Sequence, residues 1–326
     1  MRLAHIHFNG SISYTRSLAL QNALLERHFA HKDFLRRNPK RLEDENTGGV
    51  AQKSPATSHD TGTSGNGARA EAQETTPPDP TLITFSTTPT YTVGRRHLQT
   101  NPISDTQQSF LSASGAATFH ASPRGGLLTY HAPGQLTGYV VGDLRRFGIT
   151  PRCWVRLLEN SVMRTCAAFG VENTTRTDDP GVWIRDSDRK ICAIGVQVSR
   201  GVTSHGVGLN VFDHVIPVDV TERYAFTKAQ VASPSYDPAT RGYLSWGFSR
   251  IVACGLEGKS VTWMDRERST KPGPLAEVVE EVVHRSKLMS LVGDVFAKEI
   301  SQSINKMKGA GKEEIESVYR LEDPES

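Results

Sequence analysis

The sequence has few cysteines, no long apolar run and no cluster of basic residues, and each shortage excludes a class of protein. No apolar run approaches the roughly 20 residues needed to cross a bilayer, so we expect no membrane span. The formal charge of +3, with no basic stripe, gives no reason to expect a nucleic-acid partner. The cysteines lie far apart and form no C-x-x-C pair: Cys153, Cys166, Cys192 and Cys254. This spacing argues against a zinc site and a disulfide framework, so we expect no metal.

The N-terminus also lacks clear targeting features. MRLAHIHFNG does not have the charged-then-apolar layout of a secretory signal. It also lacks the long Arg- and Ser-rich helix typical of a strong mitochondrial presequence. Taken alone, the N-terminus leaves the compartment open.

Large hydrophobic residues are nearly missing from residues 36–80, where Leu42 and Val50 are the only large aliphatics and no Phe, Trp or Tyr occurs. Such a segment cannot bury enough apolar surface to offset its ordering entropy, which predicts a disordered insertion. A second, more aromatic insertion is expected at about 213–247. We therefore expect one domain over residues 1–306, followed by a polar, loose tail at 307–326.

The remaining segments show strand and helix patterns. Alternation from Ala4 to Phe8 predicts a half-buried strand, and a helix capped by Ser13 should follow. The apolar face of this helix is expected to carry four residues: Tyr14, Leu18, Leu25 and Phe29.

Further along the chain, strands are expected at 81–85 and on both sides of a turn at 132–134, and a hairpin is expected around 186–189. Thr150 and Pro151 should begin another helix, and a periodic helix is expected between Leu275 and Phe296. Because strands and helices mix without strict alternation, we expect a single α+β domain.

Three places could carry chemistry. Residues 124–131, RGGLLTYH, place glycines beside polar residues, which suits either close backbone approach to a ligand or a structural turn. Neither a P-loop nor a G-x-G-x-x-G pattern occurs, so a nucleotide gains no support. Lys190 opens a strand on which Cys192 should share its face. Cys254, before Gly255, suits an exposed nucleophile or a small buried hydrophobe. The residues alone indicate an enzyme with a possible cysteine nucleophile, assisted by Lys190 or a histidine.

Read in order, five segments resemble the lipoyl(octanoyl) transferase family. They are YTVGRR from Tyr91, RGGLLTYHAPGQL from Arg124, KICAIG from Lys190, HGVGLNV from His205 and ACGL from Ala253. The second segment resembles the family signature R-G-G-x-x-T-Y-H-G-P-G-Q-L. The resemblance covers most of the chain apart from the two insertions and the tail.

The resemblance implies an α+β fold related to the catalytic domain of biotin and lipoate protein ligases, with no cofactor. It implies an acyltransferase that takes octanoate from octanoyl-acyl carrier protein. The acceptors would be lipoyl domains of 2-oxoacid dehydrogenases and the glycine-cleavage H protein. Cys254 would carry the acyl thioester and Lys190 would tune it. The acyl pocket would be built from the following residues: Arg124, Gly125, Gly126, Leu127, Leu128, Thr129, Tyr130, His131, Ala193, Ile194, Gly195, Gly206, Val207 and Gly208.

Two departures from the family pattern stand beside this site: Ala132 replaces a glycine and Ala253 replaces a proline. The two insertions are typical of fungal or other eukaryotic members of the family. The resemblance therefore implies a mitochondrial enzyme, with the cytoplasm as the alternative location. The rival interpretations are an ATP-dependent lipoate or biotin ligase and an inactive relative that only binds lipoyl domains or acyl carrier protein. Cys192 is a rival nucleophile. Arg95, Arg96, Arg145 and Arg146 are candidate contacts for an acidic carrier protein, or ordinary solvated or fold-stabilising arginines.

Overall fold

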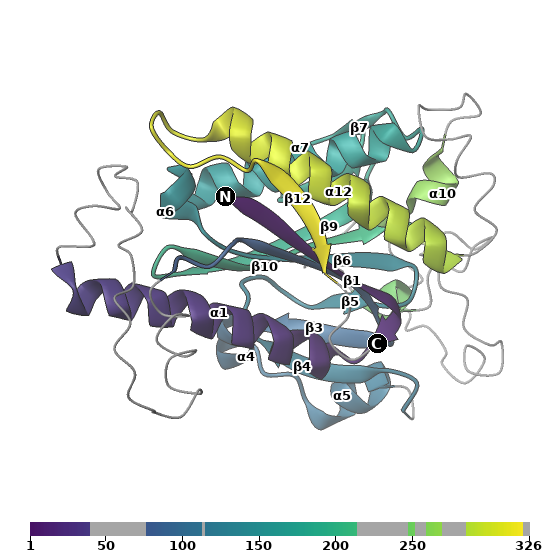
Figure 1. The fold of residues 1–326 in the computed structure, drawn as a ribbon. Helices are drawn as coiled ribbons and strands as arrows, with labels where there is room; N and C mark the ends of the chain where they lie inside the picture. Colours follow the sequence, from purple (N-terminus) through teal and green to yellow (C-terminus); the bar gives the residue numbers. More distant parts are fainter. Residues whose placement is uncertain (40–75, 113–114, 214–246, 252–258, 269–284, 322–326) are drawn as a thin grey trace.

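The computed structural model describes residues 1–39, 76–112, 115–213, 247–251, 259–268 and 285–321 (Figure 1). Its strands are β1 (Arg2–Ile12), β2 (Thr81–Thr87), β3 (Thr90–Gly94), β4 (Thr118–Ser122), β5 (Thr129–His131), β6 (Gln135–Asp143), β7 (Thr174–Thr175), β8 (Gly181–Ile184), β9 (Arg189–Ser199), β10 (Val202–Asn210), β11 (Ser260–Val261) and β12 (Ser317–Leu321). Its helices are α1 (Tyr14–Arg37), α4 (Arg95–Thr100), α5 (Asp105–Ser112), α6 (Leu144–Phe147), α7 (Pro151–Ala168), α10 (Met264–Glu267) and α12 (Arg285–Met307), with a 3-10 turn η2 (Phe248–Arg250). The predicted α+β class is confirmed.

A mixed sheet forms the centre of the molecule. Among the described residues its strands run in the order β12-β1-β2-β6-β10-β9-β8-β7, and β11 pairs with β9. β1 pairs in parallel with β2 and β12, whereas the pairings from β2 through β6, β10, β9, β8 and β7 are antiparallel. The hairpin predicted around residues 186–189 is confirmed as β8 and β9.

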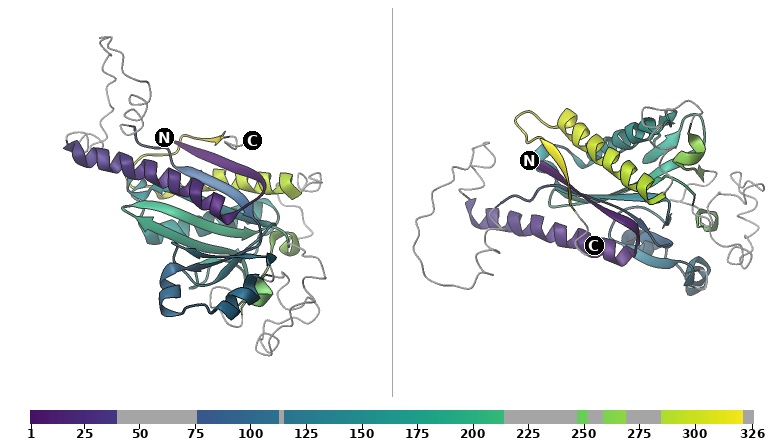
Figure 2. Two further views of the ribbon diagram at one scale, coloured as in Figure 1. Left: turned by 90° about the horizontal axis from the view of Figure 1, so that it is seen from below. Right: turned by 45° about the vertical axis from the view of Figure 1, so that its right-hand side comes forward.

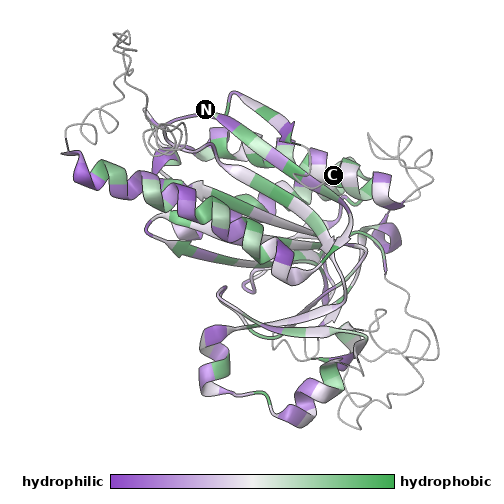
Figure 3. Ribbon diagram, turned by 60° about the horizontal axis from the view of Figure 1, so that its bottom comes forward, coloured by the Kyte–Doolittle hydropathy of each residue, from purple (hydrophilic) through white to green (hydrophobic). Residues whose placement is uncertain are grey.

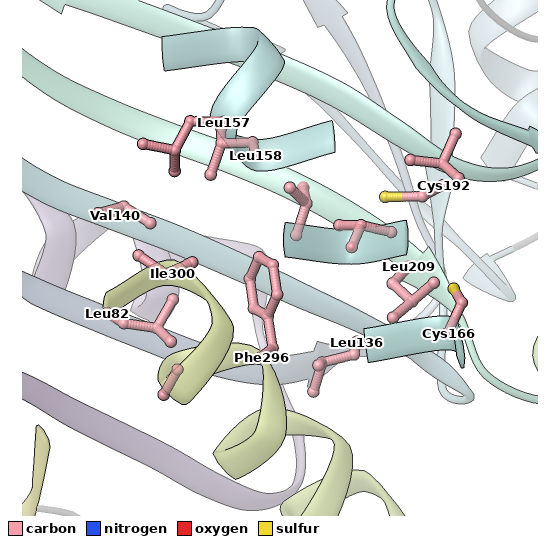
Figure 4. Packing of buried hydrophobic residues seen from close by; sticks show 14 of the residues in the cluster. Leu82, Leu136, Val140, Leu157, Leu158, Cys166, Cys192, Leu209, Phe296 and Ile300 are labelled. Carbon is pink, nitrogen blue, oxygen red and sulfur yellow. The ribbon is translucent and has the colours of Figure 1, made fainter. Parts of the chain in front are cut away.

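Helices α7 and α12 cover one face of this sheet (Figure 1). The start of α7 is confirmed: the Thr150 side chain caps it, and Pro151 occupies the first turn, where its missing N–H costs nothing. Between the helices and the sheet lies the largest apolar cluster, in which Leu158 of α7 faces Phe296 and Ile300 of α12 (Figure 4). Burial of each such side chain contributes roughly 1.5–3 kcal/mol.

Helix α1 covers the other face of the sheet (Figure 2), and the side of it seen in Figure 3 carries both hydrophilic and hydrophobic residues. Ser13 caps it as predicted, with its side chain accepting a hydrogen bond from the Arg16 N–H. The predicted buried face is only partly right. Tyr14 is buried, but Leu25 and Phe29 are half-buried.

Polar residues of α1 are buried against the sheet, where the sequence pattern predicted apolar ones. Gln21, His28 and His31 are buried there. The Gln21 amide oxygen accepts a hydrogen bond from the backbone N–H of His205 on β10, at 2.6 Å. The sheet thus presents a hydrogen-bonding group to α1, and the buried face of this helix is partly polar.

The strand predicted at residues 4–8 is confirmed within β1, but the prediction that it is half-buried is wrong. His5 and His7 are also buried, because α12 packs over the face they occupy. Both rings bind the Thr84 hydroxyl, at 2.7 and 2.8 Å, and the second nitrogen of His5 lies 3.0 Å from Asp294 of α12. These polar partners make the burial of two histidines possible.

A small sheet, in the order β4-β3-β5, lies on the same side of the molecule as α1 (Figure 1). The two strands predicted around residues 132–134 are confirmed as β5 and β6, but they belong to different sheets. The turn between them therefore passes the chain from the small sheet to the large one, and the strongest sequence motif crosses the junction.

The prediction of a loose C-terminal tail is wrong for residues 315–321. Ile315 is buried, and its backbone N–H and C=O both bind the Asn305 side chain, at 2.7 and 2.8 Å. Residues 317–321 then form β12 at the edge of the large sheet. Sequence polarity did not indicate this because an edge strand needs only backbone pairing, and four of its five side chains are exposed.

Most of the two predicted insertions lies outside the described residues, which omit 40–75 and 214–246. Both insertions therefore stay predictions, except that α1 extends to Arg37, past the expected start of the first. The expected helix from Leu275 to Phe296 is confirmed only from Arg285 onward, within α12, because residues 269–284 are outside the description.

Candidate active site around Lys190

A cleft lies where the large sheet, the small sheet, Phe248 and residues 259–261 meet. Its lining comes from the ends of β9 and β10, from β5 and β6, and from the described residues on either side of 252–258. The lining residues are Thr129, Gln135, Trp183, Lys190, Ala193, Gly208, Asn210, Phe248, Lys259, Ser260 and Val261. Of the predicted site residues, this cleft brings together Lys190, Thr129, Ala193 and Gly208.

Lys190 is the buried cation of this cleft, only 7% exposed. Its ammonium donates a hydrogen bond to the Pro180 carbonyl at 3.1 Å. The same nitrogen lies 4.5 Å from the centre of the Trp183 ring, which is the geometry of a cation–π contact. Both partners come from the segment that enters β8, so the hairpin itself holds the lysine in place.

The predicted shared face of Lys190 and Cys192 is wrong. The pairing between β8 and β9 shifts by one residue: Val182 faces Cys192, but Trp183 faces Lys190. This bulge breaks the strand alternation. Lys190 therefore points into the cleft together with Ala193, while Cys192 points into the apolar cluster beneath the sheet (Figure 4).

The described cysteines of the core have environments that disfavour a thiolate. Cys192 and Cys166 are fully buried, as Figure 4 shows. Burial raises the pKa of the Cys192 thiol well above its usual range and that of Cys166 to about 12. Cys153 lies in the first turn of α7 and packs partly against the same cluster.

Cys254, the predicted nucleophile, lies outside the described residues, as does Ala253. The chain is described again on both sides of it. Phe248 precedes Cys254 in the sequence and Lys259 follows it, and both line the cleft that holds Lys190. Strand β11 follows directly and pairs Val261 with Lys190 of β9.

The Arg124 side chain is engaged within its own loop. Its guanidinium donates to the Thr92 hydroxyl at 2.7 Å, to the Thr92 carbonyl at 3.0 Å, and to the carbonyls of Gly125 and Leu127 at 2.8 and 3.3 Å. Arg124 thereby ties the glycine-rich loop to β3. Its stem passes beside Gly195 of β9, where an added Cβ would lie 3.3 Å from the Arg124 Cδ. The arginine shapes one end of the predicted pocket.

A chain of side-chain hydrogen bonds links two of the motifs to the residue after β11. His131 Nδ1 lies 2.6 Å from the Gln135 amide oxygen, and the Gln135 amide nitrogen donates to Asn210 at 2.9 Å. Asn210 in turn donates to the Thr262 carbonyl at 2.9 Å. Since the amide oxygen of Gln135 is an acceptor, His131 donates from Nδ1. Burial, with Arg124 nearby, lowers the pKa of His131 to about 4, so the ring is neutral at pH 7.

The other predicted pocket residues have mainly structural surroundings. Leu128 and Tyr130 pack in the apolar cluster of the small sheet, and Val207 and Ile194 pack in the cluster under α7 and α12. Gly206 permits close approach of β10 and β6, since a Cβ there would overlap the Gly138 carbonyl oxygen. The remaining members are placed in the glycine-rich loop: Gly125, Gly126 and Leu127.

Reasoning from sequence missed Gln135, Asn210 and Trp183. The first two stand inside the quoted motifs, as the Gln of APGQL and the Asn of GLNV, so their polarity within apolar strands was a usable signal. Trp183 gave no signal of its own, because a Trp in a strand is ordinarily a core residue. Its position over Lys190 depends on the bulge.

The described part of the chain contains no group of three or more His, Cys, Asp or Glu side chains placed to hold a metal ion. No helix in the described ranges combines the length and apolar character that a membrane span needs.

Comparison with known proteins places these features in a family. Residues 69–221 match the model of the lipoyl protein ligase A/B catalytic domain, which confirms the predicted relation to ligase catalytic domains. A probable octanoyltransferase of Schizosaccharomyces pombe is 36% identical over 186 residues, covering 57% of this chain and 67% of the relative. An octanoyltransferase of Chloroflexus aurantiacus is 36% identical over 220 residues, covering 67% of this chain and 81% of the relative.

A third relative is the mitochondrial octanoyl-[acyl-carrier-protein]:protein N-octanoyltransferase of Danio rerio. It is 35% identical over 187 residues, covering 57% of this chain and 67% of the relative. Its name supports the expected mitochondrial location, and the yeast and fish relatives agree with the expected eukaryotic type. The matched segment includes the glycine-rich loop, Lys190 and the cleft strands β9 and β10. This chain therefore belongs to the octanoyltransferase family of acyltransferases.

Proposed function

We propose that this protein transfers an octanoyl group from octanoyl-acyl carrier protein to a lysine of a lipoyl domain, through a thioester on Cys254. The acceptors would be the lipoyl domains of 2-oxoacid dehydrogenases and the glycine-cleavage H protein. The observation that carries the proposal is a buried lysine, Lys190, in a cleft lined by residues on both sides of Cys254 in the sequence. The identity of the acyl group and of the donor is inferred from the names of the family relatives.

The first half of the reaction needs a thiolate. A free thiol has a pKa near 8.5, so only a few per cent is ionised at pH 7. An ammonium about 4 Å away contributes roughly 4 kcal/mol at an effective dielectric constant near 20, and one pKa unit is about 1.4 kcal/mol. A Lys190–Cys254 pair at that spacing would therefore make the thiolate dominant even after desolvation takes part of the gain.

In the proposed sequence the Cys254 thiolate attacks the donor thioester, and the carrier thiolate leaves. That thiolate takes a proton from the Lys190 ammonium, which leaves Lys190 neutral. The neutral amine then accepts a proton from the acceptor lysine. The acceptor nitrogen attacks the enzyme thioester, the Cys254 thiolate leaves, and the remaining proton on nitrogen goes to solvent. One thioester is exchanged for another and then for an amide, so no ATP is consumed.

Two described cysteines, Cys192 and Cys166, are poorly placed to act as the nucleophile, which supports the assignment to Cys254. Cys192 and Cys166 point into the apolar core and have raised pKa values. The bulge in β9 turns Cys192 away from the cleft that Lys190 lines. Cys192 is therefore a poor rival nucleophile, despite being two residues from Lys190.

We further propose that the acyl chain lies along the Ala193–Gly208 side of the cleft. Ala193 has only a methyl group and its partner Gly208 on the neighbouring strand has no side chain, and both lie next to Thr129 of the glycine-rich segment. In this proposal Arg124 acts by holding the loop, because its guanidinium already has four hydrogen bonds.

The activity is tested by incubating the purified protein with octanoyl-acyl carrier protein and a lipoyl domain that lacks its acyl group. Mass spectrometry should show one octanoyl group on the lipoyl domain without ATP. Free octanoate with ATP should give no product. Product only from octanoate with ATP would indicate a ligase, and no product under either condition would indicate a protein that only binds.

A further inference from the structure

A buried carboxylate lies near Lys190 and is not used in the proposed reaction. Glu159, in the middle of α7, is only 4% exposed. Its Oε1 accepts a hydrogen bond from the Gly181 N–H at 3.2 Å. Burying a carboxylate is costly unless hydrogen bonds or opposite charges compensate it. Its place beneath the entry to β8 therefore suggests a role connected with that segment.

A single peptide group joins Glu159 to Lys190. The carbonyl oxygen of Pro180 accepts a hydrogen bond from the Lys190 ammonium at 3.1 Å, and the N–H of the same peptide, that of Gly181, donates to Glu159. The negative end of the peptide dipole thus faces the ammonium, and its positive end faces the carboxylate. Each charge polarises the peptide in the sense that strengthens the hydrogen bond of the other.

The peptide is held where it is from several sides. Gly181 has a φ of +134°, and an added Cβ would lie 2.6 Å from the Cys192 carbonyl oxygen and 3.2 Å from Lys190 Cε. Trp183 covers the lysine from the other side, and its indole N–H donates to the Asp179 carbonyl at 3.2 Å. The segment from Asp179 to Trp183 therefore fixes the distance between the lysine and the carboxylate.

The groups around Glu159 favour its charged form, although burial acts against them. Burial raises the pKa of Glu159 above its usual value, and the Gly181 N–H, Arg176, Arg156 and Lys190 oppose this shift without reversing it. Around Lys190, the second cation is Lys259, whose ammonium lies 5.8 Å from the same Trp183 ring. Glu159 is thus an anion on the side of the Pro180–Gly181 peptide opposite to the Lys190 ammonium.

We propose that Glu159 is a positioning residue, which holds the Lys190 ammonium in place and in its charged form through the Pro180–Gly181 peptide. The proposal rests on the role given to Lys190 in the proposed function. A protonated Lys190 would keep the Cys254 thiolate stabilised until the carrier thiolate takes the proton. Two hydrogen bonds of 3.2 and 3.1 Å with one peptide group between them place the two charges roughly 8 Å apart. At an effective dielectric constant near 20, loss of the carboxylate charge should lower the pKa of Lys190 by about 1.5 units.

The test separates the charge of Glu159 from its hydrogen bond. Glu159→Gln keeps an oxygen that can accept from the Gly181 N–H but removes the charge. Asp178→Asn is the matched control, because it removes an exposed carboxylate from the same loop. The pKa of Lys190 is measured by NMR on protein labelled with carbon-13 at the lysine Cε, with Lys190→Arg identifying the signal.

We expect Glu159→Gln to lower the pKa of Lys190 by about 1.5 units, and Asp178→Asn to change it by less than about 0.3 unit. The alkaline limb of the octanoyl-transfer rate should move to lower pH by the same amount as the pKa. An unchanged pKa in Glu159→Gln overturns the proposal.

A shifted pKa with an unmoved rate profile would leave the charge coupling real but overturn the positioning role in the reaction. Transfer activity in Lys190→Ala separates the two proposals. If Lys190→Ala keeps full activity, the role of Lys190 in the proposed function fails, whatever the NMR titration of the wild-type lysine shows.

Discussion

At the scale of single residues, β9 shows how one irregularity assigns opposite environments to two neighbours. Lys190 and Cys192 would share a face in a regular strand, but the bulge opposite Val182 and Trp183 separates them. Lys190 meets a carbonyl and an indole ring in the cleft, whereas Cys192 is fully buried among aliphatic side chains. The chemistry of the strand therefore depends on a backbone feature.

This separation predicts the behaviour of Cys192→Ala. Because its thiol fills space in the apolar cluster, its loss should cost about 1 kcal/mol of stability through a small cavity. At a temperature where the variant is folded, its rate of octanoyl transfer should stay within about twofold of the wild-type rate, because Cys192 does not line the cleft. A twofold change corresponds to ~0.4 kcal/mol in the activation free energy. Thermal unfolding and the transfer assay measure the two effects. A loss of acyl transfer with unchanged stability would restore Cys192 as a candidate nucleophile.

At the scale of elements, Asn305 of α12 fixes the segment that leads into the C-terminal strand β12. Asn305 binds both the N–H and the C=O of Ile315, and β12 follows along the edge of β1. Farther along the same pair of elements, Arg320 of β12 lies 2.9 Å from Asp294 of α12, which also contacts His5. Helix, edge strand and second strand thus form one connected unit.

We predict that Asn305→Ala releases this strand. Two hydrogen bonds to a buried backbone segment are lost, which should cost about 2 kcal/mol. Hydrogen exchange should accelerate in β12 and along the β12 side of β1, and Lys306→Ala, an exposed neighbour, should leave it unchanged. If exchange in β12 is as slow in Asn305→Ala as in wild type, the clamp is not what holds the strand.

How far the sequence predicts these elements depends on the kind of interaction that forms them. The start of α7 was predictable from Thr150 and Pro151, and the β8–β9 hairpin from its polar turn, because both signals are local. β12 was not, because its stabilising contacts are backbone pairs with β1, more than 300 residues away. The buried face of α1 was mispredicted because its partners, such as His205, come from a distant strand.

The candidate site likewise contains residues that the sequence motifs located and residues that only the fold brings together. The motifs that resemble the family located Lys190, Thr129, Ala193 and Gly208, and the fold does bring these four to one cleft. The hydrogen-bond chain through Gln135 and Asn210 joins β6, β10 and the residues after β11, and it could not be derived without the strand register. The bulge and the Glu159–Gly181 contact likewise arise only from the pairing of β8 with β9 and its packing on α7.

At the scale of the whole molecule, buried neutral histidines should make stability sensitive to acid. Burial lowers the pKa of His7, His28 and His131 to about 4 and that of His205 to about 3. In the unfolded chain each takes up a proton near pH 6.5, whereas in the folded state it does not until about pH 4 or lower. The unfolded state therefore binds more protons in this window, and stability falls as pH decreases from 6.5 toward 4.

With between three and four protons taken up on unfolding near pH 5.5, the free energy of unfolding should fall by about 5 kcal/mol per pH unit. Chemical denaturation at a series of pH values between 7.5 and 5 measures this slope. Glu159 acts in the opposite sense, since its pKa is raised, but it is a single group. A free energy of unfolding that is constant between pH 7 and pH 5 would contradict the assignment of these histidines as neutral.

The central claim is that Cys254 carries the octanoyl group beside Lys190. Incubation with octanoyl-acyl carrier protein, without an acceptor, followed by mass spectrometry of the intact enzyme and of its peptides, tests it most directly. We predict one added octanoyl group, located on the peptide that contains Cys254, absent in Cys254→Ala and retained in Cys192→Ala. An octanoyl group that persists in Cys254→Ala, or that is lost in Cys192→Ala, would contradict the account.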